Sequence, residues 1–257
     1  MNSAVERATR GPFDGVLQIV RYNWSLYVAA IFGSVLVIGF VVVVHPPTVL
    51  AGLLILGAIA ALFWLAVSLA VSHYVYDRSD LYRWQWIRER IAPNAGHVVN
   101  IHAGLDETSL ALQEMYPAAE VTILDIYDAA EMPEPSIARA RREVGSTLAS
   151  VNADFRKLPL ATASADLVTV IFVAHELRRP ASKEAFFRDL ARVIKPGGRV
   201  LLVEHLRDAW NLLAFGPGAF HFFPRSEWLR VADATGFRLS EEISWTVFVH
   251  AFVFVQA

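Results

Sequence analysis

The sequence predicts an α/β protein in which a seven-stranded, mostly parallel sheet with helices on both faces follows a two-helix transmembrane hairpin. Two observations support this prediction. Residues 22 to 76 contain no Asp, Glu, Lys or Arg, so this part of the chain is long and uncharged. After Gly96, short apolar runs alternate with amphipathic segments, which is typical of strands and helices that alternate around a parallel sheet.

The composition excludes several classes of function. The chain has 257 residues and a net charge of -2, so no basic surface and no nucleic-acid partner are expected. It has no cysteine, which excludes disulfides, thiolate nucleophiles and cysteine-ligated metals. Hydrophobic residues make up 55% of the chain, a high share for a soluble protein, and the uncharged segment accounts for the excess.

The uncharged segment is predicted to cross a membrane twice. A helix needs about 20 apolar residues to span the roughly 30 Å hydrocarbon core. His45-Pro46-Pro47 is the expected turn, because proline ends a helix and restricts the residue before it. We expect spans at 25–44 and 48–72. A buried soluble hairpin would show a polar face, and a signal peptide would be shorter.

Positive charges flank the hairpin but are missing from its turn. Arg7, Arg10 and Arg21 precede it and Arg78 follows it, so the positive-inside rule places both termini in the cytoplasm. The excess of arginine over lysine points to a bacterial inner membrane. Gly57 and Ala61 form a pair of small residues that serves helix packing within the hairpin or a homo-oligomer formed through it.

The segment after the hairpin, "LYRWQWIRERI" at 81–91, has apolar residues at helical spacing and arginines between them. This pattern predicts an amphipathic helix on the membrane surface with its tryptophans in the interface. The expected organisation is a cytoplasmic N-terminal segment at 1–24, the transmembrane hairpin at 25–76, the surface helix and linker at 77–96, and a sheet domain at 97–257.

Within the sheet domain, the periodicity of apolar residues predicts each element in order. Asp106 is expected to cap the first helix of this domain. The expected strands are 97–102, 119–125, 146–154, 165–175, 199–205, 237–244 and 246–256. The expected helices are 107–116, 133–144, 183–194 and 225–235.

Polar residues follow the ends of the predicted parallel strands, where ligands bind in such sheets. Asp125 follows Gly104 by about 20 residues, the spacing at which a carboxylate holds the ribose of a nucleotide. An ionised carboxylate can accept hydrogen bonds from both ribose hydroxyls. Comparable positions are occupied by Asp154, by His175-Glu176 and by Glu204-His205.

Four segments together resemble a class I S-adenosylmethionine-dependent methyltransferase, a Rossmann-like fold: "VTILDIYD", "NADFRKLPL", "ADLVTVIFVAHEL" and "RVIKPGGRVLLVEH". The resemblance covers residues 97 to 257 and implies S-adenosylmethionine as the cofactor. It implies that Asp125 binds the ribose and Asp154 the adenine amino group. The expected cofactor-binding residues are Asn100, His102, Ala103, Gly104, Asp106, Asp125, Ile126, Asp154 and Phe155.

The loop after the first strand departs from the pattern of the family. Asn100 replaces an acid, His102 the first glycine and Asp106 the last glycine. "HAGLDETS" is nevertheless similar to the "GAGLDT" loop of the leucine carboxyl methyltransferase branch, so Gly104 is expected where the backbone passes closest to the ligand. A nicotinamide dehydrogenase, the competing interpretation, would need a fuller glycine fingerprint.

Methyl transfer needs an aligned acceptor and, for some acceptors, a group that takes up a proton. The candidate catalytic residues are His175, Glu176 and His221, with Glu204 and His205 as further candidates for the base. No group of residues has the spacing of a metal site. The apolar segment 209–228 is expected to line an acceptor pocket, to enter the bilayer or to contact the helix at 81–91.

The sequence therefore favours a membrane-anchored methyltransferase acting on a lipophilic, membrane-resident small molecule. A lipid headgroup, a quinone or isoprenoid, and a hydrophobic thiol or phenol all remain candidate acceptors. Anchoring near the bilayer would raise the local concentration of such an acceptor. The alternative is a membrane-bound scaffold that keeps the fold with little or no activity.

Overall fold

The computed structural model describes residues 11–143 and 149–257, and it divides the chain into two compact units. The first unit comprises Met1–Ser79 together with Ala209–Ala219, and the second comprises Asp80–Asp208 together with Phe220–Ala257. The division differs from the expected one in two respects. Residues 80–96 group with the sheet domain, and a short segment after the fifth strand groups with the N-terminal helices.

The first unit is built on a helical hairpin, α2 (Asp14–Val44) and α3 (Thr48–His73). The chain turns at His45, whose φ of 53° lies in the left-handed region, and Pro47 immediately precedes α3. Among the described residues, both helices are long and apolar enough to cross a membrane, and only 6% of each apolar window is buried. The hairpin and its turn agree with the sequence, although α2 begins well before residue 25. Arg7 and Arg10 lie outside the described residues.

The segment expected to form a membrane-surface helix does not form one. It contains short turns of 3₁₀ and π type: η1 (Tyr74–Arg78), η2 (Asp80–Arg83) and η3 (Ile87–Ile91). Leu81, Trp84 and Ile87 are almost completely buried, and the ring of Trp86 lies 4.8 Å from that of Trp245. The apolar side chains thus pack within the sheet unit, and this removes their surface from water without any membrane.

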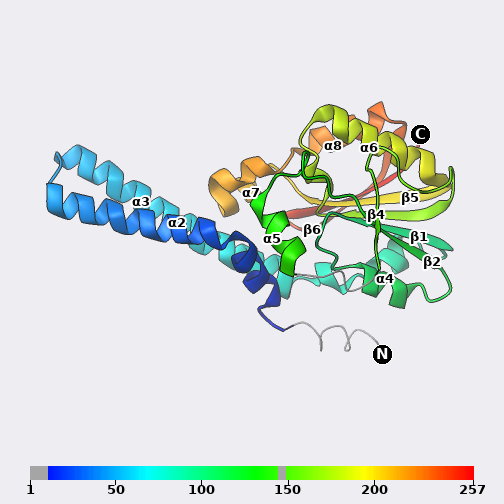
Figure 1. Cartoon of the computed structure of the whole chain (residues 1–257), viewed down its shortest axis with the longest axis horizontal. Coiled ribbons are helices and arrows are strands. Elements are labelled where there is room, and N and C mark those ends of the chain that lie inside the picture. Colours follow the sequence, from blue (N-terminus) through cyan, green and yellow to red (C-terminus); the bar gives the residue numbers. More distant parts are fainter. Residues whose placement is uncertain (1–10, 144–148) are drawn as a thin grey trace. The chain divides into compact units, whose positions relative to one another are not determined.

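The second unit contains a seven-stranded sheet in the order β3-β2-β1-β4-β5-β7-β6 within the described residues (Figure 1). All neighbouring strands are parallel except β7, which is antiparallel to both β5 and β6. This is the predicted fold class. The strands are β1 (His97–His102), β2 (Glu120–Asp125), β3 (Val151–Asn152), β4 (Ala165–Ile171), β5 (Ile194–His205), β6 (Phe237–Thr246) and β7 (Val249–Gln256).

Helices cover both faces of this sheet: α6 and α8 lie on one side and α4 on the other (Figure 1). The α-helices that follow β1 in the described residues are α4 (Ser109–Met115), α5 (Pro135–Glu143), α6 (Pro180–Val193), α7 (Ala209–Phe215) and α8 (Arg225–Ala234), of which α7 belongs to the first unit. The strand expected at 146–154 is short, and part of it falls in 144–148, outside the described residues.

The predicted strand 165–175 ends earlier than expected. β4 stops at Ile171 because Phe172 adopts a left-handed φ of 53°, and its amide donates to the carbonyl of Val203 at 2.9 Å. A 3₁₀ turn, η4 (Ala174–Glu176), follows directly. The apolar run continues past the strand because the residues of the turn are also buried.

An aromatic cluster joins α6, α8 and the last two strands. Phe187 lies 6.4 Å from Trp228, 6.4 Å from Phe237 and 6.2 Å from Phe254, measured between ring centroids. All four side chains are almost fully buried. This packing holds α6 and α8 against β6 and β7.

We predict that Phe187→Ala lowers the free energy of unfolding by about 3–5 kcal/mol, because it removes a buried aromatic ring and leaves a cavity. Denaturant unfolding of the protein in detergent would measure the loss. Val247→Ala, at a 48% exposed position between β6 and β7, is the matched control and should change stability by less than about 0.5 kcal/mol. Equal losses in both variants would contradict this account of the core.

Candidate functional site

The carboxyl ends of the parallel strands meet at one edge of the sheet. β1 lies between β2 and β4, so the chain moves outward from β1 in opposite directions on its two sides. Such a reversal of strand order is the place where α/β sheets bind ligands. His102 pairs in register with Asp125 at this edge, and β5 ends there at His205.

The loop after β1 requires a glycine at position 104. Gly104 has a φ of +126°, which side-chain-bearing residues rarely adopt. A Cβ atom there would overlap the side chain of Arg141, whose Cδ lies 2.9 Å from its position. The amide of Gly104 donates to Nδ1 of His102 at 3.2 Å. The histidine that replaces the expected glycine therefore stabilises the turn.

Asn100 connects β1 to the start of α4. Its side-chain amide donates to Asp106 at 3.2 Å and to Ser109 Oγ at 2.8 Å, and its Oδ1 accepts from Thr169 Oγ1 at 2.7 Å. Asp106 Oδ1 also accepts the backbone N–H groups of Thr108 and Ser109, so it caps α4 as the sequence predicts. A carboxylate is thus present next to position 100, although it comes from the loop and not from the strand.

His102 keeps one ring nitrogen without a partner. Its Nε2 is buried and has no hydrogen-bond partner among the described residues. Burial lowers the pKa of His102 below its usual range, although the charges of Asp106 and Asp125 act in the opposite direction. A buried polar atom without a partner is unusual, and here it lies at the edge of the sheet where a ligand is expected.

Asp125 is buried at the end of β2 and binds two groups of the chain. Its Oδ1 accepts the backbone N–H of Tyr127 at 3.0 Å, and its Oδ2 forms an ion pair with Arg141 at 2.6 Å. The guanidinium of Arg141 also lies 4.3 Å from the centroid of the Tyr127 ring. Arg141 comes from α5, and the sequence analysis did not identify it, because nothing in its spacing distinguishes it from Arg139 and Arg142.

Asp154 follows the neighbouring strand but has a different partner. Its side chain is 57% exposed, and it accepts from the backbone N–H of Arg156 at 2.9 Å. The carboxylates of Asp125 and Asp154 are thus held by different arginines. Three other residues of the expected set are buried in the core around this edge: Ala103, Ile126 and Phe155.

A second group of side chains lies after β4 and β5. His175 is held by Glu204, a fully buried residue of β5, in two ways. The backbone N–H of His175 donates to Glu204 Oε1 at 3.2 Å, and its Nδ1 lies 2.7 Å from Glu204 Oε2. This double contact fixes both the main chain and the ring, so Nε2 of His175 has a defined direction.

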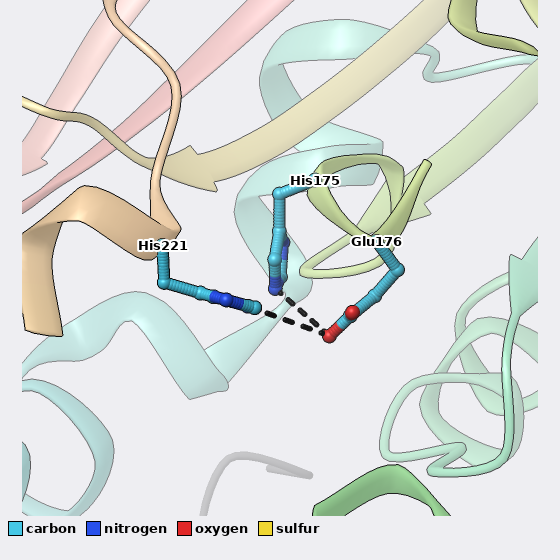
Figure 2. Close-up of side chains that lie close together, drawn as sticks. All are labelled: His175, Glu176 and His221. Carbon is cyan, nitrogen blue, oxygen red and sulfur yellow. Dashed lines mark ion pairs between the residues drawn. The ribbon is translucent and has the colours of Figure 1, made fainter. Parts of the chain in front are cut away.

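Nε2 of His175 points toward Glu176, and so does the ring of His221 (Figure 2). The distances to Glu176 Oε1 are 3.2 Å from His175 Nε2 and 3.7 Å from His221 Nε2. The other oxygen, Oε2, is buried and has no hydrogen-bond partner among the described residues. The fold thus brings together the three predicted catalytic residues, although His221 lies far from the other two in sequence.

Charged neighbours shift the pKa values of His175 and Glu176. Burial alone would lower the pKa of His175, but the nearby charges of Glu204 and Glu176 outweigh it and raise the pKa to about 10. Burial would raise the pKa of Glu176, but the charge of His175 outweighs it and holds that pKa well below its usual range. The pair is therefore an ion pair at neutral pH, and His175 is not a free base in the ligand-free protein.

Arg178 joins the two histidines through their backbones. Its Nη1 donates to the carbonyl of His175 at 3.2 Å and to the carbonyl of His221, and its guanidinium lies 4.6 Å from the centroid of Phe223. Sequence reasoning missed this residue. The sequence "HELRR" places it close to His175, but only the fold shows that it also reaches His221.

The apolar segment 209–228 is divided between the two units. α7 packs on α3: Trp64 Nε1 donates to the carbonyl of Leu213 at 3.1 Å, and a Cβ atom at Gly216 would meet the Trp64 ring. Trp210 and Phe220 remain exposed. By contrast, Phe222 belongs to the sheet unit and stacks on His205 at 4.9 Å. α7 is thus part of the same unit as the hairpin.

Comparison with known proteins gives similarities in sequence and in fold. Residues 100–202 match the sequence profile of a family described as "Methyltransferase domain". The structure resembles the mitomycin 7-O-methyltransferase MmcR, with a TM-score of 0.55, 16% identity, and coverage of 96% of this chain and 74% of that one. It also resembles the pyocyanin biosynthetic protein PhzM, with a TM-score of 0.53, 18% identity, and coverage of 74% and 58%. At these identities the likeness shows the fold alone.

Two relatives with curated names are similar to this chain in sequence. The ubiquinone/menaquinone biosynthesis C-methyltransferase UbiE of Pseudomonas putida is 31% identical over 157 residues, which cover 58% of this chain and 59% of the relative. The enzyme of the same name from Ectopseudomonas mendocina is 35% identical over 133 residues, or 49% of each chain. Residues 100–202 are therefore similar to a methyltransferase domain, and the chain spans about half to three-fifths of the length of these curated relatives.

We predict that the protein loses stability as the pH falls through about 6.5, the pKa of an unperturbed histidine, because of His102. The folded state holds His102 neutral, whereas the unfolded chain takes up a proton, so protonation favours unfolding. His102→Gln should flatten this part of the profile, as measured by chemical unfolding across the pH range. His250→Gln, at a partly exposed histidine, is the control, and an unchanged profile in His102→Gln would contradict the prediction.

Proposed function

We propose that this chain is a membrane-anchored S-adenosylmethionine-dependent methyltransferase whose acceptor is a lipophilic, membrane-resident small molecule. The observation that supports the proposal is the edge of the sheet, where Gly104 follows β1 and Asp125 ends β2, because a nucleoside cofactor would need a glycine turn and a carboxylate at such positions. The match of residues 100–202 to a methyltransferase domain supports it.

The residues at this edge fit the cofactor. The buried Asp125 is placed to accept the ribose hydroxyls, and the left-handed Gly104 allows close approach of a ligand to the loop. Asp106 replaces the acid missing at position 100 and is the proposed partner of the methionine amino group. His102 Nε2 offers a further buried polar atom. Ala103, Ile126 and Phe155 supply apolar walls, and Asp154 is the proposed partner of the adenine amino group.

Arg141 competes with the cofactor for Asp125. Its guanidinium binds the carboxylate that the ribose would need, and its side chain lies over Gly104. Cofactor binding therefore requires the side chain of Arg141 to move away from Asp125, from Gly104 or from both. Two charged hydrogen bonds from the ribose hydroxyls, each worth about 1.5–3 kcal/mol, would replace the single hydrogen bond that Arg141 Nη1 donates to Asp125.

His175, Glu176 and His221 form the proposed acceptor side. When bound, S-adenosylmethionine supplies an electrophilic methyl group on a sulfonium. Glu176 Oε2 is buried and unpartnered among the described residues, so it is the polar atom best placed to bind a hydroxyl of the acceptor. His175 and His221 hold the other oxygen of this carboxylate in place. Because His175 already carries a proton, the ring of His221 is the group proposed to take up the proton that the acceptor loses.

The acceptor class follows from the hairpin and from the relatives. Two long apolar helices with exposed side chains would place the domain at a bilayer, where lipophilic molecules are concentrated. The relatives from Pseudomonas putida and Ectopseudomonas mendocina carry a name of ubiquinone/menaquinone biosynthesis. Among the candidate acceptors we therefore favour a quinone-type ring over a lipid headgroup.

We predict that Asp125→Asn weakens S-adenosylmethionine binding by at least about tenfold, because the amide loses charged hydrogen bonds to the ribose. Isothermal titration calorimetry on the full chain in detergent would measure the change. Arg141→Met should act in the opposite direction and tighten binding, because it frees Asp125. The exposed Asp233→Asn is the control. Unchanged affinity in Asp125→Asn, or an absence of binding in the unaltered protein, would refute the proposed cofactor site.

We predict that the turn at residues 45–48 faces away from the cytoplasm. The chain has no cysteine, so Thr48→Cys and Val247→Cys each introduce a single thiol. In intact bacterial cells a membrane-impermeant maleimide should label the first variant, and it should label the second only after the membrane is opened. Labelling of both thiols in intact cells, or of neither, would contradict the proposed topology.

One observation favours a second function. The Arg141–Asp125 pair would also suit a scaffold that keeps the fold without turning over cofactor. The two functions differ in one measurement: incubation of the protein with methyl-labelled S-adenosylmethionine and total membrane lipid extract. Transfer of label to a lipid-soluble species supports the enzyme, whereas cofactor binding without transfer supports the scaffold.

A further inference from the structure

The geometry of His175, Glu176 and His221 points to a binding site for one divalent transition-metal ion of the zinc type. These residues each offer one ligand atom, and the three atoms lie within 4.8 Å of one another. Two imidazole nitrogens and one carboxylate form a common protein site for zinc and for related first-row metals. We propose this site independently of the methyl transfer proposed above.

Two of the three distances between the ligand atoms suit a shared ion. Two ligand atoms that are each about 2.1 Å from one metal ion can be at most about 4.2 Å apart. Glu176 Oε1 lies 3.2 Å from His175 Nε2 and 3.7 Å from His221 Nε2, and both distances fall within this limit. Figure 2 shows the rings directed at the carboxylate from two different segments of the chain. All three ligand atoms lie within 4.8 Å of one another, so a bound ion would need the two imidazole nitrogens to be no more than about 4.2 Å apart.

Other residues hold the proposed ligands in place, as is typical of metal sites. A metal-bound histidine typically donates its other ring nitrogen to a carboxylate, which fixes its tautomer and orientation. Glu204 does this for His175, with Nδ1 and Oε2 2.7 Å apart, and Glu204 is fully buried. Arg178 binds the backbone carbonyls of both His175 and His221, and this holds the two ligand-bearing segments together.

A separate observation is that one oxygen atom of the cluster has no hydrogen-bond partner among the described residues. Glu176 is 8% exposed, and its Oε2 has no hydrogen-bond partner among the described residues. Two buried carboxylates, Glu176 and Glu204, face His175, and Glu176 also faces the partly exposed His221. Buried negative charge is costly unless a cation or hydrogen bonds compensate for it. A divalent ion would compensate for both carboxylates, one directly and one through His175.

The site would leave coordination positions open. Three protein ligands with a free fourth position are the arrangement of catalytic zinc sites, in which the ion polarises a bound oxygen. A hydroxyl or carbonyl oxygen of the acceptor is a suitable fourth ligand. The fold therefore offers a way to bind an oxygen-bearing ring through a metal. A two-histidine set selects against Mg²⁺, which prefers oxygen ligands.

The test uses the full chain in detergent, without an affinity tag and stripped of metal by a chelator. We expect one equivalent of Zn²⁺ to bind by calorimetry and one equivalent of Co²⁺ to give visible ligand-field absorption. His221→Ala should abolish both signals, and Glu204→Gln should weaken binding by about 10–100-fold. His221 is partly exposed, so its removal should leave the fold intact, which circular dichroism would verify.

His250→Ala is the matched control, because His250 also pairs with a glutamate, at 3.0 Å, but away from this cluster. It should retain full Zn²⁺ and Co²⁺ binding. The proposal is overturned if neither ion binds stoichiometrically, if His221→Ala binds as well as the unaltered chain, or if Mg²⁺ binds as tightly as Zn²⁺. Failure to bind S-adenosylmethionine in the same preparation would refute the methyltransferase proposal and leave the metal site standing.

Discussion

The buried carboxylate of Glu204 is the constraint on which the arrangement of the site depends. It lies at the end of β5 with no exposed surface, so it must be paired within the protein. His175 provides that pairing through its backbone and its ring. Because parallel pairing fixes β5 against β4, this interaction also fixes where the chain goes after β4 ends. The positions of Glu176 and Arg178 then follow from the same turn.

The two halves of the site differ in how their charges are satisfied. On the proposed cofactor side, Asp125 and Asp106 are satisfied by groups that a ligand could replace or join, an arginine and backbone amides. On the proposed acceptor side, Glu176 and Glu204 both contact His175, and Glu176 also faces His221. The carboxylates of the first half are thus paired with groups of the protein. In the second half one carboxylate oxygen of Glu176 still lacks a partner among the described residues.

Much of the fold could be predicted from the sequence. The absence of charge between residues 22 and 76 determines the hairpin, and the alternation of apolar runs after Gly96 determines the sheet. The segment 81–91 could not be placed, because an amphipathic pattern fits a membrane surface and a protein surface equally well. Its tryptophans pack in the sheet unit instead.

The site was predictable where it depends on strand ends and not where it depends on helices or long-range contacts. Asp125 and His175 follow buried strands, so their place at the edge could be expected. Arg141 and Arg178 are ordinary arginines in sequence and acquire their contacts only through folding. The role of Asn100 was also hidden, because its partner Asp106 compensates from the loop.

The backbone of Phe172 has a consequence for the whole acceptor side. A bulky residue in the left-handed region costs about 1–3 kcal/mol, and glycine would avoid that cost. The phenyl ring instead stacks on His205, with 5.3 Å between centroids, and the strained turn delivers the chain to His175. Conformational strain at this one residue is thus exchanged for rigidity of the residues that follow. The domain gives up some of its thermodynamic stability to keep a preorganised set of polar groups.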